Sequence, residues 1–83
     1  MEEKIPLSVA IITKNEAANL PGCLRSVAFA RQIVVVDSGS DDGTLEIARG
    51  FGCEVYSVPW KGFGAQKQAA IDRCREPWVL VLD

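Results

Sequence analysis

No stretch of this 83-residue sequence is apolar for long enough to cross a membrane. The longest apolar runs are four or five residues, whereas a spanning helix needs about 20. The acidic start, Met-Glu-Glu-Lys-Ile, is not followed by an apolar core, so no secretory signal is expected. The sequence also lacks Gly-x-Gly-x-x-Gly after its first predicted strand and Gly-x-x-x-x-Gly-Lys-Ser/Thr anywhere. These absences disfavour Rossmann dehydrogenases and P-loop enzymes.

An excess of positive charge and a Cys-x-x-Cys pair are also lacking. The net charge of -2 and the pI near 5.0 argue against a protein that binds nucleic acid through the phosphate groups. Cys23, Cys53 and Cys74 show no Cys-x-x-Cys spacing, which is typical of reduced thiols in a cytoplasmic protein, and we expect them in the core. With 48% hydrophobic and 24% charged residues, the composition is that of one small globular domain.

Strand and helix patterns alternate along the chain. Short runs rich in β-branched residues predict strands, and apolar residues three or four apart predict helices between them. The predicted strands are 7–13, 33–36, 53–58 and 78–82, and the predicted helices are 19–28, 44–51 and 65–75. This order predicts an α/β fold with a mostly parallel sheet. We expect 53–58 at an edge and the wholly apolar 78–82 in the middle of that sheet.

Polar residues follow the predicted strands directly, at 13–16, at 37–42, at Lys61 and at Asp83. The carboxyl ends of parallel strands share one edge, where open α/β sheets bind ligands. Asp37, at the end of a buried strand, has two interpretations that we weigh equally. Its carboxylate can accept a hydrogen bond from a ribose hydroxyl or a base N–H, or it can cap its own turn.

An acidic edge repels a diphosphate unless a divalent cation lies between them, and Asp83 is the candidate ligand for such a cation. We expect Asp41 and Asp42 to stabilise the start of the next helix through its dipole. Lys61 and Lys67 can neutralise phosphate charge as point cations, with the better case for Lys67.

The aromatic residues Trp60 and Phe63 are expected to cover the core rather than to stack on a ligand. The chain stops at Asp83, directly after an apolar strand, so we also expect it to be the amino-terminal part of a longer protein.

Three segments together resemble family 2 glycosyltransferases. They are Ser-Val-Ala-Ile-Ile-Thr-Lys-Asn-Glu-Ala-Ala-Asn-Leu at 8–20, Ile-Val-Val-Val-Asp-Ser-Gly-Ser-Asp-Asp-Gly-Thr at 33–44 and Val-Leu-Val-Leu-Asp at 79–83. The Lys-Asn-Glu form at 14–16 and the segment 62–68 are most similar to the bacterial branch that adds glucose or a similar sugar to the lipopolysaccharide inner core.

The resemblance implies a Rossmann-like GT-A fold with helices on both faces of the sheet, in which residues 1–83 form the donor half and the acceptor half is absent. It implies that Thr13 and Glu16 lie near the base and ribose of a nucleotide-sugar, usually UDP-linked, and that Asp37 holds the uracil or the ribose. Lys67 would approach the nucleotide or its phosphates. Asp83 would be the first acid of an Asp-x-Asp motif that binds Mg²⁺ or Mn²⁺.

The chemistry implied is inverting displacement, in which a carboxylate deprotonates an acceptor hydroxyl that attacks the anomeric carbon. The catalytic base lies beyond Asp83, so the fragment alone should not catalyse transfer. The implied partners are the remainder of the polypeptide and a saccharide or lipid-linked saccharide acceptor. The implied location is cytoplasmic, with a peripheral association with the inner membrane if the acceptor is lipid-linked.

Other classes fit less well. A sugar-phosphate nucleotidyltransferase needs a glycine-rich, arginine-bearing loop after the first strand, and 14–16 does not supply one. A phospho-receiver module needs an acid pair there, and Thr-Lys-Asn at 13–15 is wrong for it. A non-catalytic nucleotide-binding or purely structural domain stays open.

Overall fold

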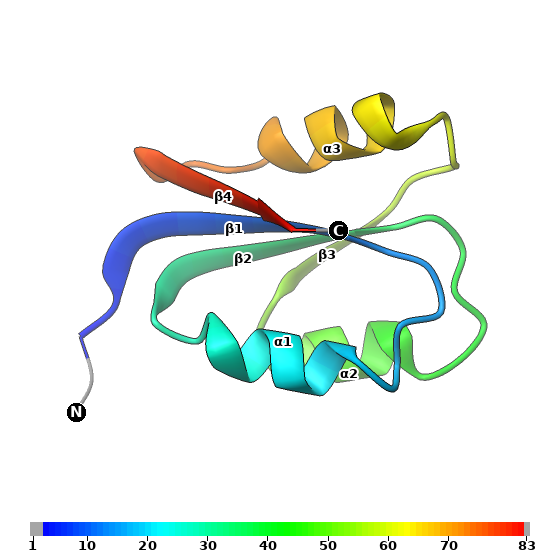
Figure 1. Ribbon diagram of the computed structural model, residues 1–83, viewed down its shortest axis with the longest axis horizontal. Helices are drawn as coiled ribbons and strands as arrows, with labels where there is room; N and C mark the ends of the chain where they lie inside the picture. Colours follow the sequence, from blue (N-terminus) through cyan, green and yellow to red (C-terminus); the bar gives the residue numbers. More distant parts are fainter. Residues whose placement is uncertain (1–2, 83) are drawn as a thin grey trace.

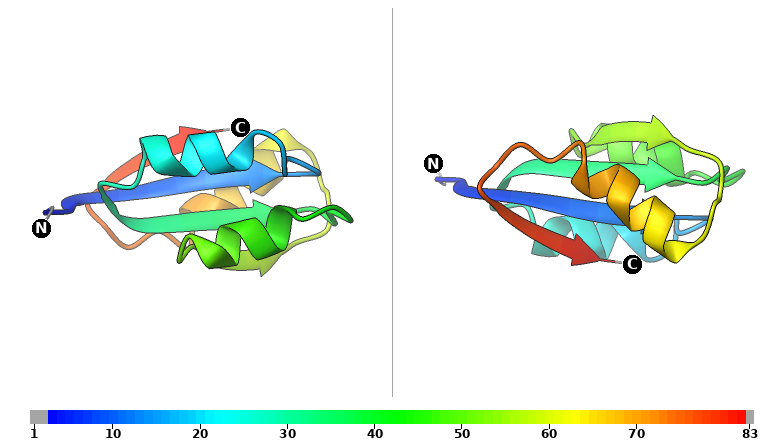
Figure 2. Two further views of the ribbon diagram at one scale, coloured as in Figure 1. Left: turned by 90° about the horizontal axis from the view of Figure 1, so that it is seen from below. Right: turned by 90° about the horizontal axis from the view of Figure 1, so that it is seen from above.

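The computed structural model describes residues 3–82 as a four-stranded parallel sheet with helices on both faces (Figure 1). Strands and helices alternate as predicted, in the order β1 (Ile5–Thr13), α1 (Leu20–Ser26), β2 (Ala30–Asp37), α2 (Thr44–Gly50), β3 (Glu54–Ser57), α3 (Phe63–Ile71) and β4 (Trp78–Leu82). Helices α1 and α2 cover one face, and α3 covers the other (Figures 1 and 2). The predicted fold class is confirmed.

Strands β1 and β2 form the centre of the sheet, whose order is β3-β2-β1-β4. Their side chains alternate between two apolar clusters because successive residues of a strand point to opposite faces. The cluster under α1 and α2 comprises Val9, Ile11, Leu20, Leu24, Val27, Ala30, Val35 and Ala48. The cluster under α3 comprises Ala10, Val34, Val36 and Ala70. The three cysteines are free and half-buried, and they pack against these clusters as expected.

Strand β4 is where the predicted topology is wrong. It pairs with β1, from Leu7 opposite Trp78 to Ile11 opposite Leu82, and no strand among residues 3–82 pairs with its other edge. Trp78 is 71% exposed, and Val79 and Leu80 are also exposed. The apolar run indicated a strand that can bury both faces, but it carries no information about which strands lie beside it. Strand β3 lies at the opposite edge, as predicted.

Helix ends differ from the predicted ones by a few residues. Phe51, the last residue of the predicted helix 44–51, lies outside α2 and is exposed, because α2 ends at Gly50 and the chain turns at Gly52 with φ +81°. Only glycine adopts that φ without strain. Helix α3 begins at Phe63, two residues earlier than predicted, and ends at Ile71. Asn19 lies at the N-cap of α1, but its side chain makes no capping hydrogen bond.

A buried amide joins the amino-terminal ends of the strands. Gln32 Oε1 accepts hydrogen bonds from Ser8 Oγ at 2.5 Å and from the Arg75 N–H at 2.9 Å. Its Nε2 donates to Glu54 Oε1 at 3.1 Å and to the Arg73 carbonyl at 2.9 Å. One side chain therefore ties β1, β2 and β3 to the connection that leads into β4.

We predict that Gln32→Leu lowers the free energy of unfolding by about 3 kcal/mol, because it leaves the buried Ser8 hydroxyl and the Arg75 N–H without their acceptor. Urea unfolding monitored by circular dichroism measures the change. The matched control is Gln68→Leu, on the exposed face of α3, which should cost less than about 0.5 kcal/mol. Equal losses in the two variants would contradict this role for Gln32.

Candidate functional site

The parallel register brings the ends of three strands to one edge. Thr13 pairs with Asp37, and Asp37 pairs with Ser57. The polar segments 13–16 and 37–42 therefore lie side by side, as their positions after strands predicted.

Asp37 is fully buried, and its carboxylate accepts hydrogen bonds from the end of β1 and from the turn that follows β2. Oδ1 accepts hydrogen bonds from Thr13 Oγ1 at 2.7 Å and from Ser40 Oγ, and Oδ2 accepts from the N–H groups of Gly39 at 2.9 Å and Ser40 at 2.7 Å. Burial raises the pKa of this carboxyl, but the four hydrogen bonds outweigh it and the net pKa lies below the usual value. The turn-capping interpretation is confirmed, and direct contact of Asp37 with a ligand stays a prediction.

The loop after β1 is fastened to the turn after β2. Asn15 has φ +54°, which turns the loop toward the neighbouring segment. Lys14 Nζ donates a hydrogen bond to the Gly39 carbonyl. Asn15 forms two hydrogen bonds with the turn, one from its N–H to Ser40 Oγ and one from the Asp41 N–H to its Oδ1. The next two N–H groups of the loop donate to side chains near the start of α2, that of Glu16 to Thr44 Oγ1 and that of Ala17 to Asp42 Oδ2. Two loops about 25 residues apart in the sequence thus form one rim joined by hydrogen bonds.

Asp42 also forms hydrogen bonds with the start of helix α2, whose N-cap residue is Gly43. Its Oδ1 accepts from the backbone N–H and the hydroxyl of Thr44, the first residue of the helix. The Thr44 hydroxyl is the largest cause of its lowered pKa. Asp42 therefore contacts the start of the helix, as expected, whereas stabilisation of the helix dipole by Asp41 and Asp42 stays a prediction.

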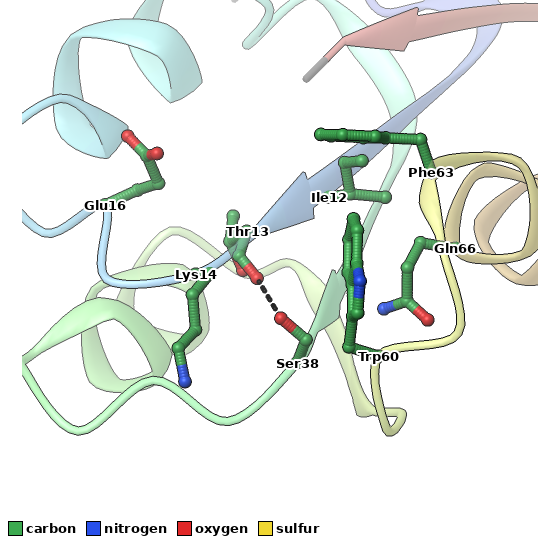
Figure 3. A pocket seen from close by; sticks show the side chains of 8 residues that line it. All are labelled: Ile12, Thr13, Lys14, Glu16, Ser38, Trp60, Phe63 and Gln66. Carbon is green, nitrogen blue, oxygen red and sulfur yellow. Dashed lines mark hydrogen bonds between the residues drawn. The ribbon is translucent and has the colours of Figure 1, made fainter.

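A cavity of about 380 Å³ opens between this rim and the connection from β3 to α3 (Figure 3). Its lining residues are Ile12, Thr13, Lys14, Glu16, Ser38, Trp60, Phe63 and Gln66. Its size is typical of small-molecule sites. Of the residues predicted from the sequence, Thr13 and Glu16 line the cavity, whereas Asp37 does not line it and forms hydrogen bonds with the residues of its rim. Lys67, in α3, is half-buried and is not among the lining residues.

The expectation for Trp60 and Phe63 is wrong. They are 52% and 63% exposed, so they do not seal the core, and both line the cavity. Gln66 was not singled out from the sequence at all. The position of the connection 58–62 after β3 was a signal for the carboxyl edge, but the sequence does not show which side chains near it face a cavity.

The described residues do not by themselves form a metal site. Within residues 3–82 no group of three carboxylate, thiol or imidazole side chains is placed to hold a cation. Glu16 is the carboxylate that lines the cavity. Asp83 lies outside the described residues, so its role as a metal ligand stays a prediction.

Comparison with known proteins identifies the family. The model of glycosyl transferase family 2 matches residues 8–83. This chain belongs to that family. The match covers the strand ends and the loops that build the cavity rim, and the four-stranded parallel sheet agrees with the GT-A fold expected from the resemblance.

Individual relatives agree with this assignment. The chain is 40% identical to "Lipopolysaccharide core biosynthesis glycosyltransferase LpsC" of Rhizobium meliloti, over 100% of this chain and 33% of that protein. It is 37% identical to "Glycosyltransferase AglJ" of Haloferax volcanii, over 94% of this chain and 27% of that protein. The chain thus spans about a third or less of the length of these relatives.

Two solved structures have the same arrangement of strands and helices. One is glucosyl-3-phosphoglycerate synthase from Mycobacterium tuberculosis in complex with uridine diphosphate, with a TM-score of 0.75 and 26% identity, covering 88% of this chain and 31% of that one. The other is residues 1–349 of S. aureus TarS, with a TM-score of 0.82 and 25% identity, covering 100% of this chain and 27% of that one. Among the described residues of our chain, none of the helices is both long and apolar enough to cross a bilayer.

We predict that Asp37→Asn lowers the free energy of unfolding at pH 7 by about 2 kcal/mol, because an amide cannot accept all four hydrogen bonds. The folded pKa of Asp37 lies below its unfolded value, so the stabilisation is complete above the unfolded pKa and is lost as the pH falls through the folded pKa. The difference in the free energy of unfolding between wild type and Asp37→Asn should therefore become smaller in strong acid.

Urea unfolding at pH 7 and at about pH 3 measures both effects. Asp41→Asn is the matched control, since it removes the same charge from an exposed side chain in the same turn. If the two variants lose equal stability at pH 7, the account of the Asp37 carboxylate is wrong.

Proposed function

We propose that this chain forms the nucleotide-binding half of a family 2 glycosyltransferase that takes a sugar from a UDP-linked donor. The observation that carries the proposal is the cavity at the carboxyl edge of the sheet, which is lined by the residues that the motifs indicated, Thr13 and Glu16. The solved relative from Mycobacterium tuberculosis, which was crystallised with uridine diphosphate, supports the choice of nucleotide.

Each residue has a role in this proposal that follows from its chemistry. Glu16 is an acceptor-only group on the rim and suits the ribose hydroxyls. Thr13 orients its hydroxyl toward Asp37 Oδ1, so the buried carboxylate fixes the end of β1 beside the ligand. Lys14 brings a positive charge to the cavity wall, and Lys67 lies further along α3, where it can approach the diphosphate.

The acidic rim requires a cation for the diphosphate, and Asp83 comes directly after β4 in the sequence. We propose that Asp83 and a partner acid beyond residue 83 hold Mg²⁺ or Mn²⁺, which would neutralise charge on the leaving diphosphate. The transfer step would be an inverting displacement whose base also lies beyond residue 83.

For the acceptor, we propose a saccharide of the lipopolysaccharide inner core or its lipid-linked precursor. The supporting observation is the 40% identity to the relative named as a lipopolysaccharide core glycosyltransferase. A lipid-linked acceptor would place the enzyme in the cytoplasm at the surface of the inner membrane.

The test uses the full-length polypeptide that carries this chain. UDP binding is measured by calorimetry with and without Mg²⁺. We expect Glu16→Gln to weaken UDP binding roughly tenfold, because a charge-assisted hydrogen bond becomes a neutral one. Glu46→Gln, on the exposed side of α2, is the matched control and should bind UDP like wild type.

The metal ligand has its own variant. Asp83→Asn should abolish the strengthening of UDP binding by Mg²⁺ while UDP alone still binds. A wild-type protein that binds UDP but transfers no sugar from any UDP-sugar would favour the non-catalytic nucleotide-binding domain instead.

A further inference from the structure

Strand β4 exposes apolar side chains on the face of the sheet that carries α1 and α2. Leu82 packs against the apolar cluster under those helices. Because successive residues of a strand alternate between faces, Leu80 and Trp78 lie on the same face as Leu82. The register agrees, since Leu80 pairs with Val9 and Leu82 with Ile11, two members of that cluster. Trp78 is nevertheless 71% exposed and Leu80 is 40% exposed.

A second, smaller cavity lies at the far end of this strip. Its volume is about 110 Å³, and it is lined by Leu20 and Cys23 of α1, by Leu82 of β4 and by Ile11 of β1, with Thr13 and Glu16 among its polar lining residues. The cavity therefore lies between the helix and the strand. We call the surface formed by Leu20, Cys23, Trp78, Leu80 and Leu82 the β4 groove.

The free edge of β4 has the character of a strand inside a sheet. All five of its side chains are apolar, and Val79, which faces away from Leu80, is also exposed. Within residues 3–82, no strand pairs with the edge of β4 that faces away from β1 (Figure 2). Exposed apolar edge strands promote aggregation, and native proteins cover them. A covering partner for β4 is therefore required.

The amount of polypeptide in the relatives indicates the partner. This chain covers 33% of the relative from Rhizobium meliloti and 27% of the solved chain of S. aureus TarS. A membrane surface fits β4 less well, because peripheral membrane surfaces carry an excess of lysine and arginine. The net charge of this chain is -2, and Arg31 is paired with Glu76, two residues before Trp78, at 3.6 Å.

We propose that a helix of the same polypeptide, from beyond residue 83, packs lengthwise in the β4 groove. Helices cover the faces of parallel sheets, and in this groove β4 forms the floor and α1 one wall. The five residues Trp78–Leu82 span about 16 Å, which matches about three turns of a helix. Apolar side chains on one face of that helix would cover Trp78 and Leu80 and reach the small cavity beside Leu82.

The groove is next to the candidate functional site. Thr13 and Glu16 line both the large cavity and the small one. A helix seated in the β4 groove would thus lie beside two residues of the large cavity. The helix would pack there whatever ligand that cavity receives, so this proposal stands apart from the function proposed above and fails or holds independently of UDP binding.

The first test is fluorine NMR of the full-length polypeptide labelled with fluorotryptophan, in the presence of a soluble gadolinium complex that relaxes exposed nuclei. Trp78→Phe identifies the Trp78 signal by its loss, and Trp60, 52% exposed, serves as the internal comparison. We expect the relaxation enhancement at Trp78 to be severalfold weaker than that of free fluorotryptophan.

Three results of this measurement would overturn the proposal. Trp78 would relax like the free amino acid if nothing covers it. Protection of Trp78 that is lost on dilution would show that a second copy of the chain covers β4. Protection that appears only with vesicles of equal parts phosphatidylethanolamine and phosphatidylglycerol would show that a membrane does.

The second test is the thermal unfolding of full-length variants. Leu80→Asp should lower the midpoint by roughly 10 °C, because the carboxylate would be buried without a partner under the helix. Phe51→Asp is the matched control, since Phe51 is 42% exposed and lies after α2, away from the groove. It should lower the midpoint by less than about 2 °C. A midpoint of Leu80→Asp within about 2 °C of wild type would contradict the proposal.

Discussion

The buried carboxylate of Asp37 is the interaction on which the candidate site depends. It lies at the end of β2 and accepts hydrogen bonds from the end of β1 and from the turn that follows β2. Because the turn is held, its residues 39–44 can in turn fasten the loop 14–17 through side-chain and backbone hydrogen bonds. The cavity has one firm rim for this reason. A buried charge with fewer partners would be too costly to keep at this position.

The fold was predictable wherever a local pattern has one physical solution. Runs such as Ile-Val-Val-Val at 33–36 are β-branched and apolar, and they form strands buried on both faces. The order of strands is not local. The run 78–82 has the same apolar character, yet β4 pairs on one side only within residues 3–82. The end of a helix is a second example. The predicted helix 44–51 included Phe51, but α2 ends at Gly50 and the turn at Gly52 leaves Phe51 exposed.

The site was predictable in part. Thr13 and Glu16 were identified because polar residues after a buried strand mark the ligand edge of a parallel sheet, and both line the cavity. Trp60, Phe63 and Gln66 could not be assigned in the same way. Aromatic and amide side chains serve equally well in cores, and their exposure depends on how the connection 58–62 bends between β3 and α3. Tertiary structure alone distinguishes the two uses.

The central proposal is that the cavity between the rim held by Asp37 and the exposed rings of Trp60 and Phe63 receives a nucleotide. A crystal structure of the full-length polypeptide with UDP tests it most directly. The account predicts UDP in this cavity, with the ribose beside Glu16 and the Asp37 turn unchanged. UDP bound at any other surface, with this cavity closed or filled by side chains, would contradict the account.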